Sequence, residues 1–188
     1  MAPENGSNSG HSYSMASVVM TGADVKRVIS RIAHEVVEHN RGCTELVVVG
    51  LQTGGVWIAE ELCKGLLEIA AFPCALGSLD VSLYRDDHAL RPLIKSSLTD
   101  VPVSVQGETV LLVDDVLFTG RTVRAALEAI LGFGRPKAIQ LAVMVDRGHR
   151  ELPIRPDYVG KNLPTSRSEM VEVTRQGVRI LKEVGNAS

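Results

Sequence analysis

The sequence predicts an α/β fold, a twisted parallel sheet with helices on both faces and a small hood of short strands. Short, continuous apolar runs, typical of strands buried on both faces, alternate along the chain with longer segments whose apolar residues recur at helical spacing. Such alternation places successive strands parallel to one another. The 188 residues, 45% of them hydrophobic and 22% charged, are enough for one domain with a continuous core and too few for two full domains.

The first elements follow from these patterns in order. Residues 1–16 are rich in Ser, Asn and Gly and are expected to be a disordered leader, so the single domain is placed at 17–188. Residues 24–40 carry an amphipathic helical stripe. The run LVVVGL at 46–51 predicts a buried strand, and a glycine turn then leads into a second helix at about 56–70.

The rest of the chain continues the alternation and ends in a segment rich in Arg, Pro and Gly. The later elements are predicted as a strand within 74–84, a flexible loop at about 85–103, a strand at 109–114, a helix at about 121–133, a strand at 138–145 and a hood segment at about 146–175. The hood is expected to cover one end of the sheet with short strands.

Composition excludes several classes of protein. A net charge of -2 and only 4% aromatic residues argue against a global positive field for nucleic acid and against several base-stacking platforms. The three cysteines show no CxxC spacing, so no zinc site or disulfide framework is indicated. No apolar run approaches the ~20 residues of a membrane span. A cytoplasmic protein with reduced thiols and no membrane partner is expected.

The segment 110–122, VLLVDDVLFTGRT, joins an apolar strand, two carboxylates and a glycine-containing turn at a helix start. The turn at 119–122 offers backbone N–H groups, a helix dipole and hydroxyls, which suit a phosphate. Asp114 and Asp115 only accept hydrogen bonds, so beside a phosphate they suit sugar hydroxyls or a hydrated Mg²⁺. The segment predicts a ribose 5-phosphate site at the carboxyl end of a strand. Ordinary turn and helix capping by the same residues is the alternative.

The same segment closely resembles the phosphoribosyl pyrophosphate signature of type I phosphoribosyltransferases, an apolar strand, two acidic residues and a TGxT loop. It contains neither the P-loop pattern GxxxxGK[ST] nor the dinucleotide pattern GxGxxG. Other segments resemble the PyrR family, pyrimidine-operon regulators that also act as uracil phosphoribosyltransferases. These segments are RIAHE at 31–35, SLYRDD at 82–87, GRP at 134–136 and VDRGHRELPIRPDYVGKNLPTS at 145–166, so the resemblance covers almost the whole chain after the leader.

The resemblance implies a type I phosphoribosyltransferase fold and an enzyme that makes UMP and diphosphate from uracil and phosphoribosyl pyrophosphate with Mg²⁺. Positioning and electrostatics would carry catalysis, without a covalent intermediate. The implied roles are catalysis for Asp114, Asp115 and Arg85; phosphoribosyl pyrophosphate binding for Asp114, Asp115, Thr119, Gly120, Arg121 and Thr122; the pyrophosphate loop for Gln52, Thr53, Gly54 and Gly55; base binding for Val145, Asp146 and Arg147; and metal binding, through water, for Asp114 and Asp115.

Two loops have special positions in this resemblance. The pyrophosphate loop of many family members reads TRG, whereas this chain has Gly54 in place of the arginine and so lacks a guanidinium for the diphosphate. A tight strand-to-helix connection explains the same glycines without any ligand. Tyr84, Arg85 and Asp86 begin the flexible loop that in such enzymes closes over the reacting centre and excludes water.

The family also implies binding to a pyrimidine-operon leader mRNA, strengthened by UMP or UTP in the active site. The candidate RNA-binding residues are Arg27, Arg31, His34, His149 and Arg150, together with Lys26, Arg155 and Lys161. Such a set can contact RNA phosphates and loop bases. The same charges also fit an ordinary solvated helix face, and the two histidines fit capping or packing roles.

Three functions therefore remain open from the sequence. The first is a uracil phosphoribosyltransferase, the second a catalytically weak, nucleotide-sensing RNA regulator, and the third a purine phosphoribosyltransferase. The first two can coexist in one protein. The third shares the ribose-phosphate site but lacks the pyrimidine-type resemblance of the C-terminal half. The family resemblance also implies a homo-oligomer.

Overall fold

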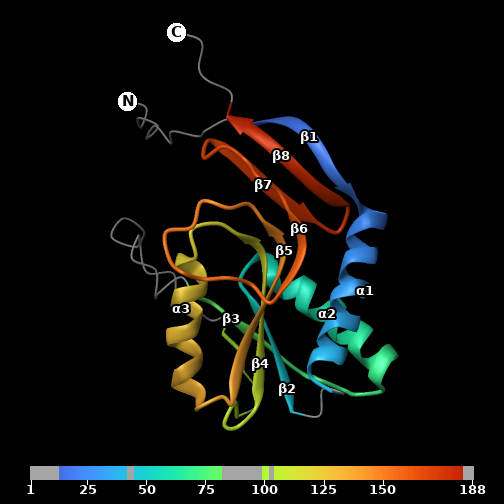
Figure 1. Ribbon diagram of the computed structural model, residues 1–188, viewed down its shortest axis with the longest axis vertical. Helices are drawn as coiled ribbons and strands as arrows, with labels where there is room; N and C mark the ends of the chain where they lie inside the picture. The colour runs from blue at the N-terminus through green and yellow to red at the C-terminus, as the bar shows by residue number, and fades with distance from the viewer. Residues whose placement is uncertain (1–12, 42–44, 82–98, 102–103, 184–188) are drawn as a thin grey trace, which may run out of the picture.

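The computed structural model describes residues 13–41, 45–81, 99–101 and 104–183. Its elements follow the predicted alternation (Figure 1). They are β1 (Tyr13–Thr21), α1 (Gly22–His39), β2 (Leu46–Leu51), α2 (Gly54–Ala70), β3 (Ala75–Leu79), β4 (Thr109–Leu117), α3 (Arg121–Ile130), a 3₁₀ turn (Leu131–Phe133), β5 (Ala138–Asp146), β6 (Tyr158–Asn162), β7 (Glu169–Thr174) and β8 (Gly177–Glu183).

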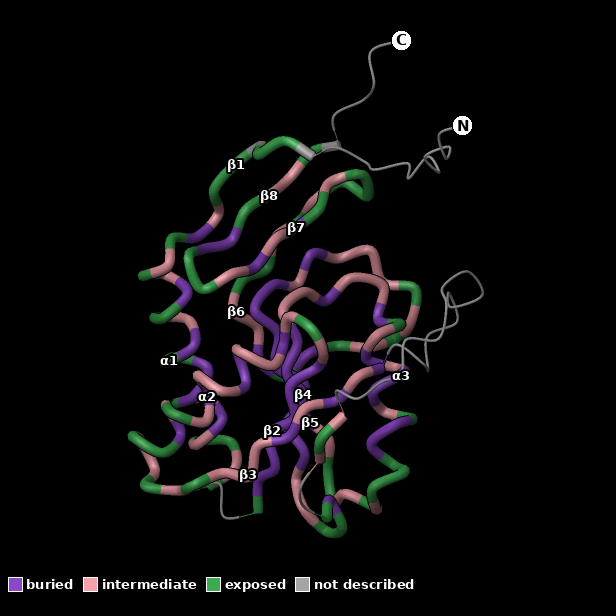
Figure 2. Tube along the Cα trace, turned by 180° about the vertical axis from the view of Figure 1, so that it is seen from behind, coloured by how far each residue is buried: buried purple, intermediate pink, exposed green. Residues whose placement is uncertain are grey.

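The main sheet is parallel, with the strand order β3-β2-β4-β5-β6. Alternate residues of its central strands point to opposite faces, as the pleat requires. Val48 packs in a core with residues of α1 and α2, whereas Val49 packs in a second core with residues of α3. Figure 2 shows the buried residues concentrated along these central strands. The prediction of a parallel sheet with helices on both faces is therefore confirmed.

Helix α1 lies along β6 and the hood. It starts with a capping box, in which the Thr21 side chain accepts a hydrogen bond from the Asp24 backbone and the Asp24 carboxylate accepts one from the Thr21 backbone. At mid-helix, Arg31 Nη2 donates to the carbonyls of Val159 and Gly160 in β6, at 2.8 and 3.0 Å. A Cβ on Gly160 would lie 2.3 Å from the Met144 carbonyl oxygen, so glycine is what allows β6 to lie this close to β5.

The hood is a separate antiparallel sheet with the order β1-β8-β7. The strands that form the hood show that two predicted boundaries are wrong. Residues 13–16, assigned to the disordered leader, belong to β1, because they pair with the distant strand β8. The hood is not the segment 146–175, because β6 extends the main sheet beside β5 and the hood takes its strands from both ends of the chain, up to Glu183.

Other predicted boundaries shift by a few residues. Helix α2 begins at Gly54 instead of Val56, and β4 continues to Leu117 beyond the predicted end at Asp114. Most of the predicted flexible loop at 85–103 lies outside the described residues; Asp100, which is described, bridges to Ser78. Cys63 and Cys74 are free, half-buried thiols. None of the helices in the described residues is long and apolar enough to cross a membrane.

Candidate functional site

The residues predicted to bind phosphoribosyl pyrophosphate and the base gather at one edge of the main sheet, where the parallel strands β2, β4, β5 and β6 have their carboxyl ends. Pairing of Gly50 with Val113 and of Leu117 with Asp146 brings the segments after β2, β4 and β5 to the same edge. Open α/β sheets bind ligands at this edge, because the turns there expose backbone N–H groups and the starts of helices.

The acidic pair lies in the last part of β4. Asp114 is only 7% exposed, and its Oδ1 accepts a hydrogen bond of 2.9 Å from the Asp115 backbone N–H. Asp115 is half-buried and its Oδ1 accepts one of 2.8 Å from Val116 N. These bonds fix both carboxylates on a rigid strand. Two adjacent, oriented carboxylates suit the vicinal hydroxyls of a ribose.

The phosphate turn follows directly. Gly120 precedes the first turn of α3 with φ of +95°, a conformation that favours glycine. Thr119 Oγ1 accepts only a long bond of 3.4 Å from Arg121 N, and the first turn of α3 contains no acidic side chain. The positive end of the helix dipole is thus not neutralised by a carboxylate of its own first turn, which suits an anion.

The pyrophosphate loop reaches the acidic pair. Its Gln52 N–H donates to Leu79 O at 2.9 Å, and the Gln52–Thr53 peptide bond is cis. A Cβ on Gly55 would lie 2.0 Å from the Val113 carbonyl oxygen, and one on Gly54 would lie 2.1 Å from Asp115 Oδ2. Both glycines therefore permit a close approach of the loop to β4. At Gly54, the space that an arginine would need is occupied by the Asp115 carboxylate.

A pocket of about 360 Å³ opens beside the ends of β5 and β6, in the region predicted to bind the base. Its walls come from the turns after the two strands: Asp146, Arg147, Gly148, His149, Asn162, Leu163, Pro164 and Thr165. Val145, the third predicted base-binding residue, does not line this pocket, because its side chain is fully buried in the core.

Arg147 is a buried cation in the wall of this pocket, with 7% of its surface exposed. Its Nε donates to Thr165 Oγ1 at 3.0 Å and its Nη2 to Ser166 O at 2.7 Å. Burial lowers the pKa of the guanidinium, and the negative charge of Glu169 partly opposes this. The side chain remains positive at neutral pH, because the pKa of arginine starts far above 7.

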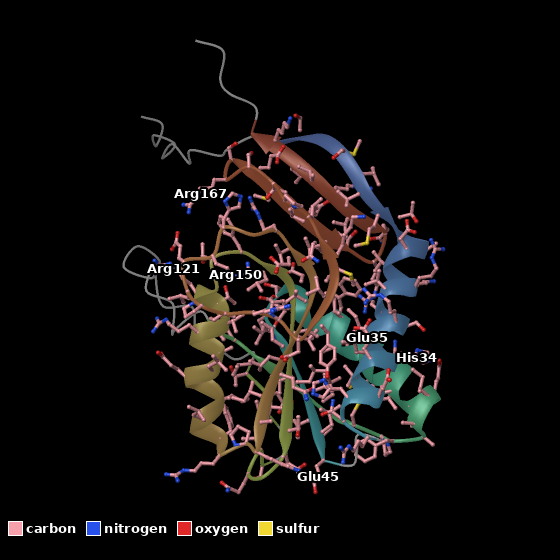
Figure 3. The ribbon with its side chains drawn as sticks, in the orientation of Figure 1. His34, Glu35, Glu45, Arg121, Arg150 and Arg167 are labelled. Carbon is pink, nitrogen blue, oxygen red and sulfur yellow. The ribbon has the colours of Figure 1, made fainter. Side chains whose placement is uncertain are left out.

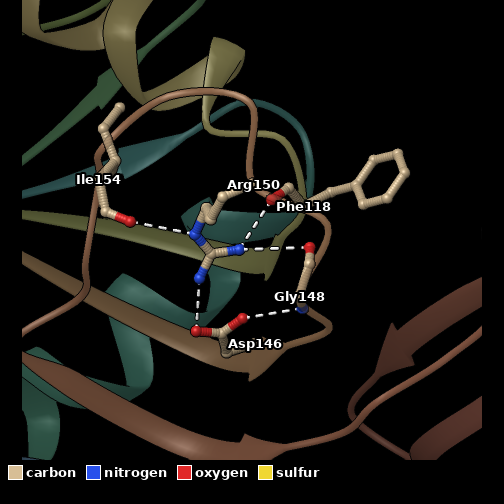
Figure 4. Close-up of polar contacts among 5 residues, drawn as sticks. All are labelled: Phe118, Asp146, Gly148, Arg150 and Ile154. Carbon is tan, nitrogen blue, oxygen red and sulfur yellow. Dashed lines mark hydrogen bonds and ion pairs between the residues drawn. The ribbon is translucent and has the colours of Figure 1, made fainter.

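Arg150 joins the phosphate turn to the turn after β5 (Figure 4). Its guanidinium donates to Phe118 O at 2.7 Å, to Ile154 O at 3.0 Å and, over a short distance, to the Asp146 carboxylate. Asp146 also accepts from Gly148 N at 3.0 Å. Arg121, another residue of the turn, pairs with Glu151 at 2.9 Å. This network could not be predicted from the residue pattern, because its acceptors are mainly backbone carbonyls.

The candidate RNA-binding residues form two separate groups. Figure 3 shows His34 on the α1 side of the main sheet and Arg150 on the α3 side. Most of them have protein partners: Arg27 pairs with Asp24, Arg31 with Glu35 and β6, His34 Nδ1 lies 2.8 Å from Ser30 O, and His149 Nε2 lies 2.5 Å from Thr165 O. Lys26, Arg155 and Lys161 are exposed. Arg85, the catalytic candidate of the flexible loop, lies outside the described residues.

The acidic pair fits a Mg²⁺ ion that arrives with its substrate. No group of three or more His, Cys, Asp or Glu side chains that could hold a metal exists within the described part of the chain. Mg²⁺ ordinarily keeps several waters and takes one or two carboxylates plus substrate phosphates. Asp114 and Asp115, beside the pyrophosphate loop, have the carboxylate oxygens that such a shared site would take from the protein.

Comparison with known proteins defines the class. The phosphoribosyl transferase domain family matches residues 19–176, and the chain belongs to it. The crystal structure of the hypoxanthine phosphoribosyltransferase of Trypanosoma cruzi superposes with a TM-score of 0.71 at 21% identity, covering 90% of this chain and 98% of that one. This likeness confirms the type I phosphoribosyltransferase fold.

Sequence relatives identify the family within this class to which the chain belongs. The Bifunctional protein PyrR of Geobacter sp. (strain M21) is 53% identical over 158 residues, covering 84% of this chain and 89% of the relative. That of Limosilactobacillus fermentum (strain NBRC 3956 / LMG 18251) is 51% identical over 164 residues, covering 85% and 90%. Within the phosphoribosyltransferases the chain therefore belongs to the PyrR family, as the sequence resemblance predicted.

Proposed function

We propose that the protein transfers the phosphoribosyl group of phosphoribosyl pyrophosphate to uracil, giving UMP and diphosphate. The observation that carries this proposal is the convergence at one sheet edge of the acidic pair, the phosphate turn, the pyrophosphate loop and the pocket with Asp146 and Arg147. Ribose hydroxyls, 5-phosphate, diphosphate and base each have a neighbouring group of suitable chemistry there.

The side chains act by positioning and electrostatics. Asp114 and Asp115 accept the ribose hydroxyls, and their negative charge favours the positive character that develops at C1 as diphosphate leaves. The backbone N–H groups at 119–122 hold the 5-phosphate, so the ribose is fixed at two points. When bound, Mg²⁺ stabilises the negative charge on the leaving diphosphate.

Base selection is assigned to the pocket of Asp146 and Arg147. Uracil presents two carbonyl acceptors and ring N–H donors, which match a guanidinium and a carboxylate or backbone carbonyl. Hypoxanthine and guanine are larger, and the purine alternative is supported only by the common fold. Purified protein incubated with phosphoribosyl pyrophosphate, Mg²⁺ and each base is expected to yield UMP alone. Formation of IMP or GMP instead of UMP would favour the purine alternative.

The second proposed function is regulation of pyrimidine genes: the protein binds a leader mRNA, and UMP or UTP in the active site strengthens this binding. In this proposal the protein is a homo-oligomer and works in the cytoplasm, where nucleotides and mRNA are found. Membership in the PyrR family supports it. Of the two basic groups, the α1 surface with Lys26 and His34 is the better candidate, because Arg150 and His149 already hold the active-site turns in place. Electrophoretic mobility shifts with a leader hairpin, measured with and without UMP, test this regulatory function. K26A should weaken RNA binding and leave UMP formation unchanged.

A further inference from the structure

Phe118 lies between the acidic pair and the phosphate turn, and no role in substrate binding follows from its position in the phosphoribosyl pyrophosphate signature. Its backbone is held in place, because its carbonyl accepts the hydrogen bond of 2.7 Å from Arg150. Figure 4 shows its ring directed away from the Arg150 network. On that side the ring meets two residues of the turn after β5, Arg147 and His149.

The contact with Arg147 is a stacked one. The guanidinium carbon of Arg147 lies 4.2 Å from the centre of the Phe118 ring, within the range of a cation–π interaction. The ring of His149 packs edge-on against the same phenyl ring, with centroids 5.7 Å apart. The aromatic ring thus forms the support on which the turn after β5 rests.

Arg147 needs such support because it is a buried cation. No carboxylate lies within ion-pair distance of it among the described residues, and a buried charge without a partner is costly. Its Nε and Nη2 donate to Thr165 and Ser166, but Nη1 has no hydrogen-bond partner in the described part of the chain. Since no buried side-chain nitrogen or oxygen there lacks a hydrogen-bond partner, Nη1 is not fully buried, and the residue that carries it lines the pocket.

We propose that Phe118 is a positioning residue whose ring holds the Arg147 guanidinium so that Nη1 meets an acceptor oxygen of the pyrimidine base. This inference rests on the proposed specificity for uracil. It adds Phe118, a residue of the phosphoribosyl pyrophosphate signature, to the residues that determine this specificity. The affinity for the base then depends on an aromatic side chain at position 118, whereas the affinity for ribose 5-phosphate does not.

The test compares two ligands that differ by the base. Isothermal titration measures the dissociation constants of UMP and of ribose 5-phosphate for the wild type, F118L and F118Y. F118L keeps most of the apolar volume but loses the π face, so its UMP affinity is expected to fall about tenfold, the size of a partly desolvated cation–π contact. Its affinity for ribose 5-phosphate stays the same, and F118Y restores UMP binding. F133L, at a phenylalanine that is 40% exposed beyond α3, is the matched control.

A double mutant separates a positioning role from direct contact with the base. In an R147Q background the F118L change is expected to have no further effect on UMP binding, because its action passes through Arg147. Equal weakening of both ligands by F118L, no weakening at all, or a full effect in the R147Q background would each overturn the inference. Failure of the wild type to bind UMP would instead refute the proposed function itself.

Discussion

Replacing Arg150 by methionine removes the network that joins the phosphate turn to the turn after β5, while it keeps much of the aliphatic volume. The Arg150 side chain is 23% exposed and that of its partner Asp146 is 16% exposed, so the pair is mostly withdrawn from water. The change leaves one oxygen of this carboxylate and the carbonyls of Phe118 and Ile154 without the Arg150 donor.

The size of the effect follows from these contacts. Breaking a fully buried pair by removing one partner costs about 3–5 kcal/mol. Residual exposure screens part of the interaction here, so we expect a loss of about 3 kcal/mol in the free energy of unfolding. For a chain of this size that lowers Tm by about 6–12 °C. The expected loss is large because several acceptors depend on one guanidinium.

Urea and thermal unfolding of R150M and of R27M, followed by circular dichroism, measure this difference. Arg27 also pairs with an aspartate, but its side chain is 73% exposed, so R27M should cost less than about 0.5 kcal/mol. If R150M were destabilised no more than R27M, Arg150 would not be a stabilising link between the two turns. UMP should bind R150M more weakly, because the supported turns line its site.

Three other changes have expected outcomes. G55A places a methyl group against a backbone carbonyl of β4 and should cost about 1–3 kcal/mol of stability or more, measured by urea unfolding. T21A removes the N-cap of α1 and should cost about 1 kcal/mol. The hydrogen bonds from Thr21 lower the pKa of Asp24, so the stabilising contribution of this carboxylate is present at neutral pH and is lost as the pH falls through its folded pKa. The difference in stability between wild type and T21A should therefore shrink at acidic pH. G54R must displace the Asp115 carboxylate, so it should raise the KM for phosphoribosyl pyrophosphate despite the added charge; a lower KM would show that Asp115 moves aside at little cost.

The sequence was sufficient for the main sheet because its signals are local. Runs such as 46–51 and 109–114 are apolar on both faces and are followed by helical periodicity, so each unit could be identified from its own residues. The hood could not be bounded in the same way. Tyr13–Thr21 becomes a strand through pairing with β8, more than 150 residues away, and its Ser-rich start resembles a leader until that partner is known.

Part of the candidate site could likewise be predicted from local sequence, and part depends on contacts between distant segments. The acidic pair and the phosphate turn are contiguous, so one segment predicts both. The environment of Arg147 depends on Phe118 and on the adjacent residues Thr165 and Ser166, which come from two separate parts of the chain. The family resemblance implies base binding for Val145 together with Asp146 and Arg147, but strand alternation turns the Val145 side chain into the core.

In the proposed reaction, Asp114 and Asp115 bind the ribose of a substrate whose phosphoribosyl group is transferred to uracil. UMP formation from uracil and phosphoribosyl pyrophosphate with Mg²⁺ should be measured for the wild type, the D114N/D115N variant and the exposed control E128Q. We expect UMP from the wild type and from E128Q, and a rate at least about 100-fold lower from D114N/D115N with an unchanged circular dichroism spectrum. The absence of UMP formation by the wild type would contradict the proposed activity, and full activity in D114N/D115N would contradict the role of the two aspartates.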